Sequence, residues 1–393
     1  MEKDNQEKLN IIMFNMSDYA EWEKGIQNRN YHIFRQLAID NKVGKILAVD
    51  YLPVKIKRAL RNYFQQWNKD FNFAERVSWA TKCKKISDKV SIYSSIYPVL
   101  SLHKFYKELR KTAKKFFNGE KYVIWSYFPL ETGYFKESGA ELKIFDAVDN
   151  WAELPVYESR KNLLKKNYHI LDDEADLIFT VSQDLENLFH HKEKVHHVPN
   201  GVDFKHYQRE YQLLNKDIGT IQKPIIGYVG NIQDRFDTDL IVYLAKNNPD
   251  KSFVLVGRIW REKREEVEGK LKNLPNVYLL GRKSYAEIPM YIQQFDVAIV
   301  AHQRNNFIKS TDPMKIYEYL ACGKPIVSTQ ESTVKELNEF VAVTADYKEF
   351  SQKINDLLAD DKPSLIEARM EIAKNHSWLK RTEKMLELIE EKL

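Results

Sequence analysis

The chain has 393 residues, which is enough for two α/β domains of ordinary size. Hydrophobic residues make up 43% and charged residues 30%, so the chain can fill a core and cover a water-exposed surface. Two cysteines exclude a disulfide scaffold and a four-cysteine zinc site, and 13 glycines with 12 prolines exclude collagen-like and low-complexity classes. The sequence starts MEKDNQEKLN, without an apolar signal stretch, and holds no apolar run of roughly 20 residues. We therefore expect a cytoplasmic protein whose membrane contact, if any, is peripheral.

Short apolar runs alternate with longer amphipathic stretches through the first half of the chain. The runs predicted as strands are NIIMFNM (10–16), KILAVD (45–50), KYVIWSYF (121–128), LKIFDAV (142–148) and ADLIFTVS (175–182). The segment VHHVPNGVD (195–203) closes this series with a proline and an Asn-Gly turn. Such alternation is typical of an open, mostly parallel sheet.

The same pattern then starts again. Its predicted strands are PIIGYVGN (224–231), SFVLVG (252–257), NVYLLG (276–281), DVAIVA (296–301) and KPIVST (324–329). Two α/β series predict two Rossmann-like domains that face a central cleft, residues 1–205 and 206–373, with a helix at 374–393 packing back on the first. Ligands of open parallel sheets bind beyond the carboxyl ends of the strands, so we expect a small-molecule site at these edges.

Positive charge is concentrated in residues 51–121. This stretch holds 17 Lys/Arg and 5 Asp/Glu, a net charge of +12 against −7 for the rest of the chain. Aromatic residues interleave with the charges, as in HKFYKELRKTAKKFFNGEK (103–121), at a spacing that predicts an amphipathic helix. A solvated helix face, attraction to an anionic membrane surface and nucleic-acid binding would all use this composition. Because no zinc-finger or RNP-like motif is present, we expect no nucleic-acid partner.

The segment TDPMKIYEYLACGKPIVST (311–329) is the most informative in the chain. Pro313 favours a helix start, because a missing N–H and a fixed φ are harmless there, and Gly323 favours its end. The N-terminus of this helix offers free N–H groups and a positive dipole end to a phosphate. Lys315 can add a charge in the first turn, and Glu318, one turn on, can bind a ribose diol.

This segment resembles the donor-site helix of glycosyltransferase family 4 and related GT-B type transferases, above all bacterial teichuronic-acid and exopolysaccharide sugar transferases. HVPNGVDFKHY (197–207) and GRKSYAEIP (281–289) are similar to further family segments, in the family's order. The resemblance implies transfer of a sugar from a nucleotide sugar, such as a UDP-sugar, to a hydroxyl of a cell-surface glycan or lipid-linked saccharide. It also implies retention of anomeric configuration and no metal or other cofactor, since a helix N-terminus and basic side chains stabilise the leaving diphosphate.

The resemblance assigns most of the donor site to the second domain. Arg235 and Lys315 are its catalytic cations, and GRKSYAEIP reads the nucleobase. The donor-binding residues that it implies are Gly230, Arg258, Arg282, Tyr285, Pro313, Met314, Lys315 and Glu318. The chain departs from the family in two places. Ser310 stands where the family often has a first glutamate, and Arg235 stands alone where an Arg and Lys pair is usual.

The acceptor side is less specific. Asp149 follows strand 142–148 and is our candidate for a general base that orients or deprotonates the acceptor hydroxyl. Polar residues that we expect at the same edge, as acceptor candidates, are Asn15, Asp18, Trp22, Arg29 and Asp146. The alternative for the aspartates is capping of the following turn.

Two other functions use the same architecture. One is a non-catalytic partner of an active transferase, which the missing glutamate at Ser310 would suit. The other is a nucleotide-sugar epimerase, for which we find no additional carboxylates and histidines. Asp237-Thr238-Asp239 imitates a metal-binding Asp-x-Asp, but its place at a predicted helix start favours capping.

Overall fold

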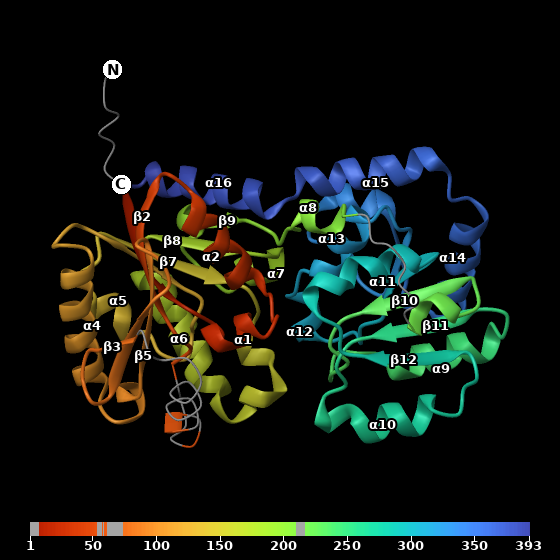
Figure 1. Ribbon diagram of the computed structural model, residues 1–393, viewed down its shortest axis with the longest axis horizontal. Helices are drawn as coiled ribbons and strands as arrows, with labels where there is room; N and C mark the ends of the chain where they lie inside the picture. The colour runs from red at the N-terminus through yellow and green to blue at the C-terminus, as the bar shows by residue number, and fades with distance from the viewer. Residues whose placement is uncertain (1–7, 53–56, 58, 61–73, 210–216) are drawn as a thin grey trace. The chain divides into compact units, whose positions relative to one another are not determined.

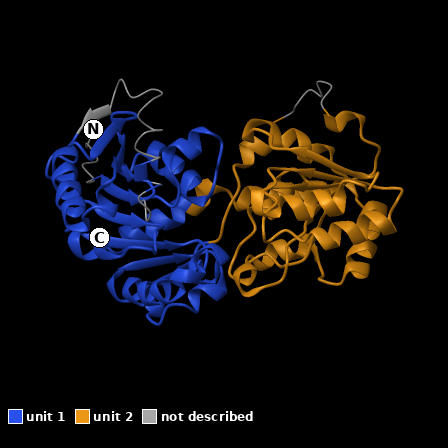
Figure 2. Ribbon diagram, turned by 90° about the horizontal axis from the view of Figure 1, so that it is seen from below, with its two compact units in different colours: residues 1–198, 382–393 blue, residues 199–381 orange. Residues whose placement is uncertain are grey.

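The computed structural model describes residues 8–52, 57, 59–60, 74–209 and 217–393. Contacts divide the chain into two compact units, shown in Figure 2. Unit 1 comprises residues 1–198 together with 382–393, and unit 2 comprises residues 199–381. The first unit is thus assembled from both ends of the chain, whereas the second is one continuous segment. Both are α/β units, which confirms the predicted fold class.

Unit 1 is built on a nine-stranded sheet in the order β3-β4-β5-β2-β1-β6-β7-β8-β9. Its strands are β1 (Leu9–Phe14), β2 (Val43–Val49), β3 (Ala74–Arg76), β4 (Thr81–Lys85), β5 (Val90–Ser95), β6 (Val123–Ser126), β7 (Leu142–Ala147), β8 (Leu177–Thr180) and β9 (Val195–His197). The strands from β5 through β9 run parallel, while β4 pairs antiparallel with both β3 and β5. The central strands are those that the sequence predicts.

Helices cover both faces of this sheet, as Figure 1 shows. They are α1 (Tyr19–Glu23), α2 (Arg29–Ile39), α4 (Leu102–Phe116), α5 (Gly133–Glu137), α6 (Lys161–Glu174), α7 (Gln183–Glu186) and α16 (Trp378–Glu390), of which Thr382 onward belongs to unit 1. Successive side chains of a strand point to opposite faces. Accordingly, Ile12 and Phe14 of β1 pack in a core with Phe105 of α4, while Ile11 and Met13 are buried on the other face.

The edge β3-β4-β5 was not predicted. β4 has the sequence TKCKK, in which lysines mask the period-2 apolar pattern of a strand. Charged residues, lysine above all, are typical of sheet edges, where they discourage pairing with another chain. The predicted basic helix is present as α4, and the rest of the basic stretch at 53–56, 58 and 61–73 lies outside the described residues.

Unit 2 contains a six-stranded, all-parallel sheet in the order β12-β11-β10-β13-β14-β15. Its strands are β10 (Ile225–Val229), β11 (Ser252–Val256), β12 (Val277–Gly281), β13 (Val297–Val300), β14 (Ile326–Ser328) and β15 (Val341–Val343). All but β15 coincide with predicted strands. Its helices are α8 (Phe204–Tyr207), α9 (Thr238–Asn247), α10 (Arg261–Leu271), α11 (Ile288–Gln294), α12 (Asn306–Lys309), α13 (Met314–Ala321), α14 (Tyr347–Ala359) and α15 (Pro363–Asn375).

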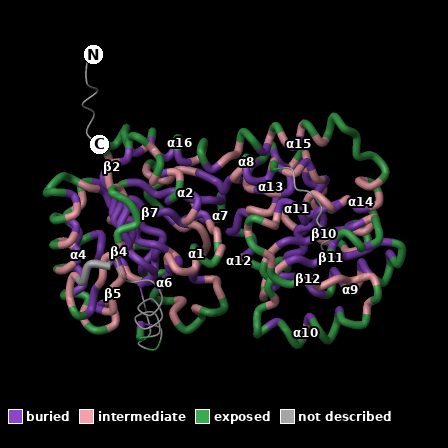
Figure 3. Tube along the Cα trace, in the orientation of Figure 1, coloured by how far each residue is buried: buried purple, intermediate pink, exposed green. Residues whose placement is uncertain are grey.

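Each face of this second sheet has its own hydrophobic core. Ile225 and Val229 of β10 pack with α11, α13 and α15, whereas the alternate residues Ile226 and Tyr228 pack with α9, α10 and α14. Figure 3 shows the buried strands between helices whose outer faces are exposed. In the described part of the chain, no helix combines the length and apolarity that crossing a bilayer requires.

Candidate active site

The order of the strands points to one place in unit 2. From β10 the chain proceeds outward to β11 and β12, and then returns to β13 on the other side of β10. Ligands of open α/β sheets bind at the carboxyl ends of the strands where the order reverses in this way. The loops that follow β10 and β13, together with the start of α13, therefore form the candidate site.

Two glycines let the strand ends approach one another closely at this edge. Gly230 follows β10 with φ +146°, and Gly257 follows β11 with φ +156°, conformations that favour residues without a side chain. A Cβ on Gly257 would lie 1.8 Å from the carbonyl oxygen of Gly230. A Cβ on Gly230 would lie 2.4 Å from Cε of Lys315. The backbone after β10 is thus bare beside the Lys315 ammonium, as a phosphate-binding loop requires.

The helix α13 begins next to this loop. Pro313 is its N-cap residue, and Met314 and Lys315 open its first turn. The preceding carboxylate of Asp312 is buried and accepts hydrogen bonds from the Asn200 N–H (2.8 Å) and the Tyr317 hydroxyl (2.7 Å). Asp312 thus anchors the helix to the Asn-Gly turn at the start of unit 2. The positive end of the helix dipole is left for a ligand.

Lys315 and Glu318 lie one turn apart on α13, and both are partly buried. The Lys315 ammonium lies 5.3 Å from the ring centroid of Tyr228. Burial, with help from the Arg235 charge, lowers the pKa of Lys315 to about 7, and Glu318 opposes this shift. Burial raises the pKa of Glu318, while Lys315 and a hydrogen bond from the Tyr207 hydroxyl counteract the rise. Lys315 thus places a titratable cation beside the glycine loop, and Glu318 lies one turn further along α13.

Arg235 supplies a second cation from the loop between β10 and α9. Its carbonyl oxygen accepts from the Gln303 N–H (2.7 Å), which ties this loop to the segment after β13. With the Gln233 amide oxygen turned toward the guanidinium, it accepts from Nε and Nη2 of Arg235, each at 2.8 Å. A neighbouring side chain therefore holds the guanidinium in place. The structure brings Arg235, Lys315 and Gly230 together as the sequence predicts.

The other predicted donor residues lie along the same edge. Arg258 and Arg282 are exposed at the ends of β11 and β12. Tyr285 begins the short 3-10 helix Tyr285–Glu287 and stacks on His206, with ring centroids 4.0 Å apart. Nε2 of His206 donates to the Tyr285 carbonyl oxygen (3.0 Å). This stack fixes the loop that we expect to read the nucleobase.

Sequence reasoning missed His302, which follows β13 and is only 2% exposed. Its pKa lies well below the ordinary histidine value because of burial and the nearby charges of Lys315 and Arg235. It also missed Tyr207, the partner of Glu318. The sequence signal for His302 was its position directly after the apolar run DVAIVA. Its proximity to Lys315 and Arg235 depends on the order of the strands in the sheet, which the sequence around one histidine does not indicate.

The acceptor candidates of unit 1 gather around the carboxyl ends of β1 and β7. Arg29 and Asp146 are completely buried and form an ion pair, with Nε 3.0 Å from Oδ1. These two side chains are engaged with each other and are not presented to solvent. They therefore stabilise the edge of the sheet. Their charges in the sequence were equally compatible with acceptor binding.

The remaining candidates are also engaged with neighbours. Oδ1 of Asn15 accepts from Asn30 (3.2 Å), and Nε1 of Trp22 donates to Ser17 (2.7 Å). Asp18 is the N-cap residue of α1, where Glu21 accepts from its N–H (3.3 Å). Asp149 is partly buried, and its carbonyl oxygen accepts from the Tyr168 hydroxyl (3.0 Å). Of the six candidates, Asp149 alone lies in a loop after β7 with its side chain partly exposed.

The Asp-x-Asp segment proves to be a helix cap. Asp237 accepts from the Leu240 N–H (3.0 Å) and from the Tyr347 hydroxyl (2.9 Å), and Asp239 pairs with Lys270 (2.6 Å). The predicted capping role is confirmed.

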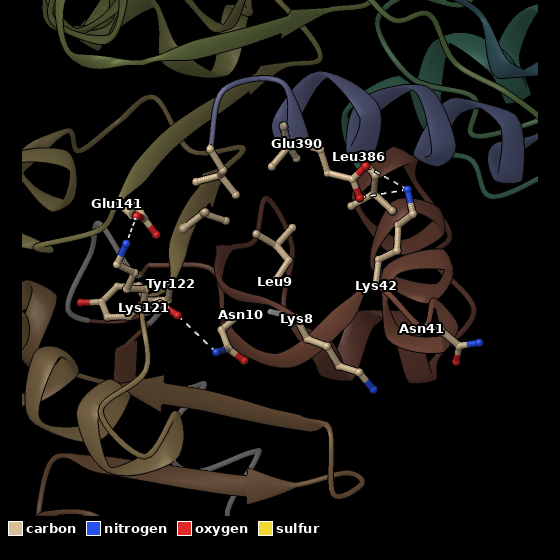
Figure 4. A pocket seen from close by; sticks show the side chains of 13 residues that line it. Lys8, Leu9, Asn10, Asn41, Lys42, Lys121, Tyr122, Glu141, Leu386 and Glu390 are labelled. Carbon is tan, nitrogen blue, oxygen red and sulfur yellow. Dashed lines mark hydrogen bonds and ion pairs between the residues drawn. The ribbon is translucent and has the colours of Figure 1, made fainter. Parts of the chain in front are cut away.

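A separate pocket of about 590 Å³ lies in unit 1 between α16 and the amino ends of β1, β2 and β6 (Figure 4). Two ion pairs occupy its rim, Lys42 with Glu390 (2.9 Å) and Lys121 with Glu141. Its place at the amino ends, opposite the ligand-binding edge of a parallel sheet, and its paired charges favour a packing groove under α16.

Residues 223–360, which contain all six strands of the unit 2 sheet, match the family model described as glycosyl transferases group 1. The chain is 26% identical over 381 residues to TuaH of Bacillus subtilis (strain 168), whose name describes it as a teichuronic acid biosynthesis glycosyltransferase. That alignment covers 91% of this chain and 92% of TuaH.

Solved structures share the fold over nearly the whole chain. Anabaena HepE in complex with UDP-glucose has a TM-score of 0.68 at 16% identity, covering 98% of this chain and all of that one. Sucrose-phosphate synthase from Thermosynechococcus elongatus has a TM-score of 0.70 at 14% identity, covering 98% and 99%. These neighbours have the GT-B fold. With the group 1 match in unit 2, the chain is a GT-B glycosyltransferase, and it resembles glycosyltransferase family 4.

Proposed function

We propose that the protein transfers a sugar from a UDP-sugar to a hydroxyl of a bacterial cell-surface glycan or lipid-linked saccharide. The observation that carries this proposal is the bare backbone at Gly230, beside the cations Lys315 and Arg235 and the N-terminus of α13. These groups suit a diphosphate, and Glu318 suits the ribose hydroxyls. The UDP and UDP-glucose complexes of HepE support the choice of nucleotide. The name of TuaH supports the class of acceptor.

The proposed chemistry needs stabilisation of a leaving group. The bond between the anomeric carbon and the phosphate oxygen breaks, the acceptor oxygen bonds to that carbon, and UDP departs with the electron pair. Lys315, Arg235 and the dipole of α13 neutralise the developing charge, so we propose that no metal is required. We propose retention of configuration, with attack from the donor's own face. Asp149 is the candidate base for the acceptor proton.

UDP release from a panel of UDP-, GDP- and ADP-sugars, with a glycan acceptor, tests this function. Lys315→Ala and Glu318→Ala should lower turnover on the order of 10²-fold, the usual effect of removing one stabilising group. Lys246→Ala and Glu265→Ala serve as matched controls, because both side chains are exposed on α9 and α10. Activity in EDTA and the anomeric form of the product test the metal and the stereochemistry. If the wild-type protein binds none of these donors in calorimetry, the proposal is wrong.

We further propose that unit 1 contacts an anionic membrane through α4, at the inner face, where nucleotide sugars are made. Its exposed lysines are Lys104, Lys107, Lys111, Lys114 and Lys115. Exposed apolar side chains accompany them: Leu102 opens α4, and Leu100 and Trp79 lie on nearby segments of the same unit. Each basic residue near an anionic surface contributes about 1 kcal/mol of attraction.

Binding to vesicles tests the membrane contact. Replacing Lys107, Lys111 and Lys114 by alanine should weaken binding to anionic vesicles about 100-fold at low salt. The same change at Lys246, Lys272 and Lys348 of unit 2 removes equal charge and should matter much less. Equal binding to neutral and anionic vesicles would show instead that α4 is a solvated face.

A further inference from the structure

His302 lies on the far side of the strand-order reversal from Gly230. It forms an antiparallel bridge with Phe236, and the next residue, Gln303, donates its N–H to the Arg235 carbonyl oxygen (2.7 Å). The backbone at His302 is therefore joined to the loop that carries the second cation of the donor site.

Neighbouring polar groups hold both the backbone and the imidazole of His302. The Thr329 hydroxyl oxygen accepts from the His302 N–H (3.0 Å), and the hydroxyl donates to the His302 carbonyl oxygen (2.7 Å). Nδ1 lies 3.1 Å from Oε1 of Gln330. Because an amide oxygen only accepts, Nδ1 carries the proton and Nε2 is left with a lone pair.

Nε2 is an acceptor with no hydrogen-bond partner among the residues that the structure describes. Leaving a buried acceptor unsatisfied is costly, and a phenylalanine of similar shape would avoid the cost. The charged groups that act on the ring are Lys315 from α13 and Arg235 from the loop after β10. Burial first, and then these two cations, lower the pKa of the ring and keep it uncharged. His302 is thus a neutral acceptor near two cations.

The position of the Lys315 ammonium suggests which donor the Nε2 atom of His302 could accept a hydrogen bond from. The ammonium lies over Gly230 and 5.3 Å from the Tyr228 ring centroid, against the loop that we propose to bind the diphosphate. An ammonium has three donors, so contact with a phosphate leaves others to be satisfied. A carboxylate in that role would cancel the charge that the phosphate needs, whereas a neutral imidazole would not.

We propose that His302 is a positioning residue of the donor site, whose Nε2 accepts a hydrogen bond from the Lys315 ammonium when that ammonium turns to a bound diphosphate. The inference rests on the proposed nucleotide-sugar function. It adds that the orphaned nitrogen is satisfied only in the complex, and that the hydrogen bond holds Lys315 on the diphosphate.

Two substitutions distinguish the contribution of Nε2 from that of Nδ1. In His302→Gln the amide reaches the place of Nε2, whereas in His302→Asn it reaches only the place of Nδ1, so it keeps the Gln330 contact and loses the acceptor. We expect His302→Asn to weaken UDP binding roughly tenfold, the usual effect of losing a hydrogen bond to a charged group, and His302→Gln to restore most of the affinity. Calorimetry with UDP measures both, and thermal unfolding checks that each variant is folded.

Nitrogen NMR of protein labelled in its 10 histidines reads the ring directly. The free protein should show a His302 ring protonated at Nδ1, and added UDP should shift the Nε2 resonance as it accepts a hydrogen bond, but not in Lys315→Ala. Wild-type affinity in His302→Asn, or an Nε2 resonance that UDP leaves unchanged, would overturn the role of His302 alone. If the wild-type protein binds no nucleoside diphosphate, the proposed function fails and this role with it.

Discussion

Lys315 gives the donor site a dependence on pH that can be worked out from its surroundings. Burial and the Arg235 charge lower the pKa of its ammonium to about 7 in the free protein. A bound diphosphate favours the charged form and raises this pKa, so binding above pH 7 takes up a proton. Affinity for UDP-glucose should be nearly constant below pH 7 and fall above it, by up to about tenfold per pH unit. Calorimetry in buffers of different ionisation enthalpy measures the proton uptake.

Two variants test whether Lys315 is the source of that dependence. Lys315→Arg keeps a cation that does not titrate near neutrality, so its affinity should lose the decline above pH 7. Glu318→Ala removes the charge that holds the pKa of Lys315 up, so the decline should begin at lower pH. An unchanged pH profile in Lys315→Arg would show that another group titrates. UDP-glucose suits the experiment because its diphosphate diester has no ionisation in this range.

The residue types in the sequence predicted where side chains lie in the fold better than what those side chains do. Arg29 and Asp146 were predicted at an edge of the unit 1 sheet, and they are there, but as a buried ion pair. The sequence pattern of a charged side chain at the end of a strand is the same whether that side chain binds a ligand or pairs with a residue 117 positions away in the chain. The converse holds for His302, whose neighbours Arg235 and Lys315 come from other elements. Those contacts follow from strand order, which one sequence does not show.

At the scale of elements, local signals were sufficient for α13 and its flanking strands. The structure places α13 at Met314–Ala321, the predicted MKIYEYLA, because proline and glycine bound it and its apolar residues recur at helical spacing. The strand β4 was not predicted, because it lacks such a local signal. Its lysines belong to an edge, and a strand that lacks an apolar face is recognisable only from the partner β5 with which it pairs.

The helix α16 is an element whose contribution to stability can be measured. Ile389 is fully buried in unit 1, next to the pocket of Figure 4. Ile389→Ala removes that packing and should lower the free energy of unfolding of unit 1 by about 2–4 kcal/mol. The ion pair that joins Glu390 of the same helix to Lys42, which precedes β2, is exposed, so Lys42→Ala should change stability little. Denaturant unfolding compares the two, and equal effects would contradict packing as the main force that holds α16.

The whole chain joins a discontinuous unit to a continuous one, and the two should respond to different changes. The donor residues Gly230, Arg235, Lys315 and Glu318 all lie in unit 2, whereas Ile389 lies in unit 1. A ligand stabilises only the structure that binds it, by about 2.7 kcal/mol at a concentration of 100 times Kd. We therefore expect UDP to raise the unfolding temperature of unit 2, and Ile389→Ala to lower that of unit 1.

Calorimetric scans of the full chain separate these effects. With UDP, one transition should move up by a few degrees while the other stays, and Lys315→Ala should abolish the movement. In Ile389→Ala the other transition should move down, and the response to UDP should persist. A single transition that responds to both changes would contradict this division, since it would mean that the two units unfold together. Two independent responses would locate nucleotide binding in residues 199–381 without any assumption about the acceptor.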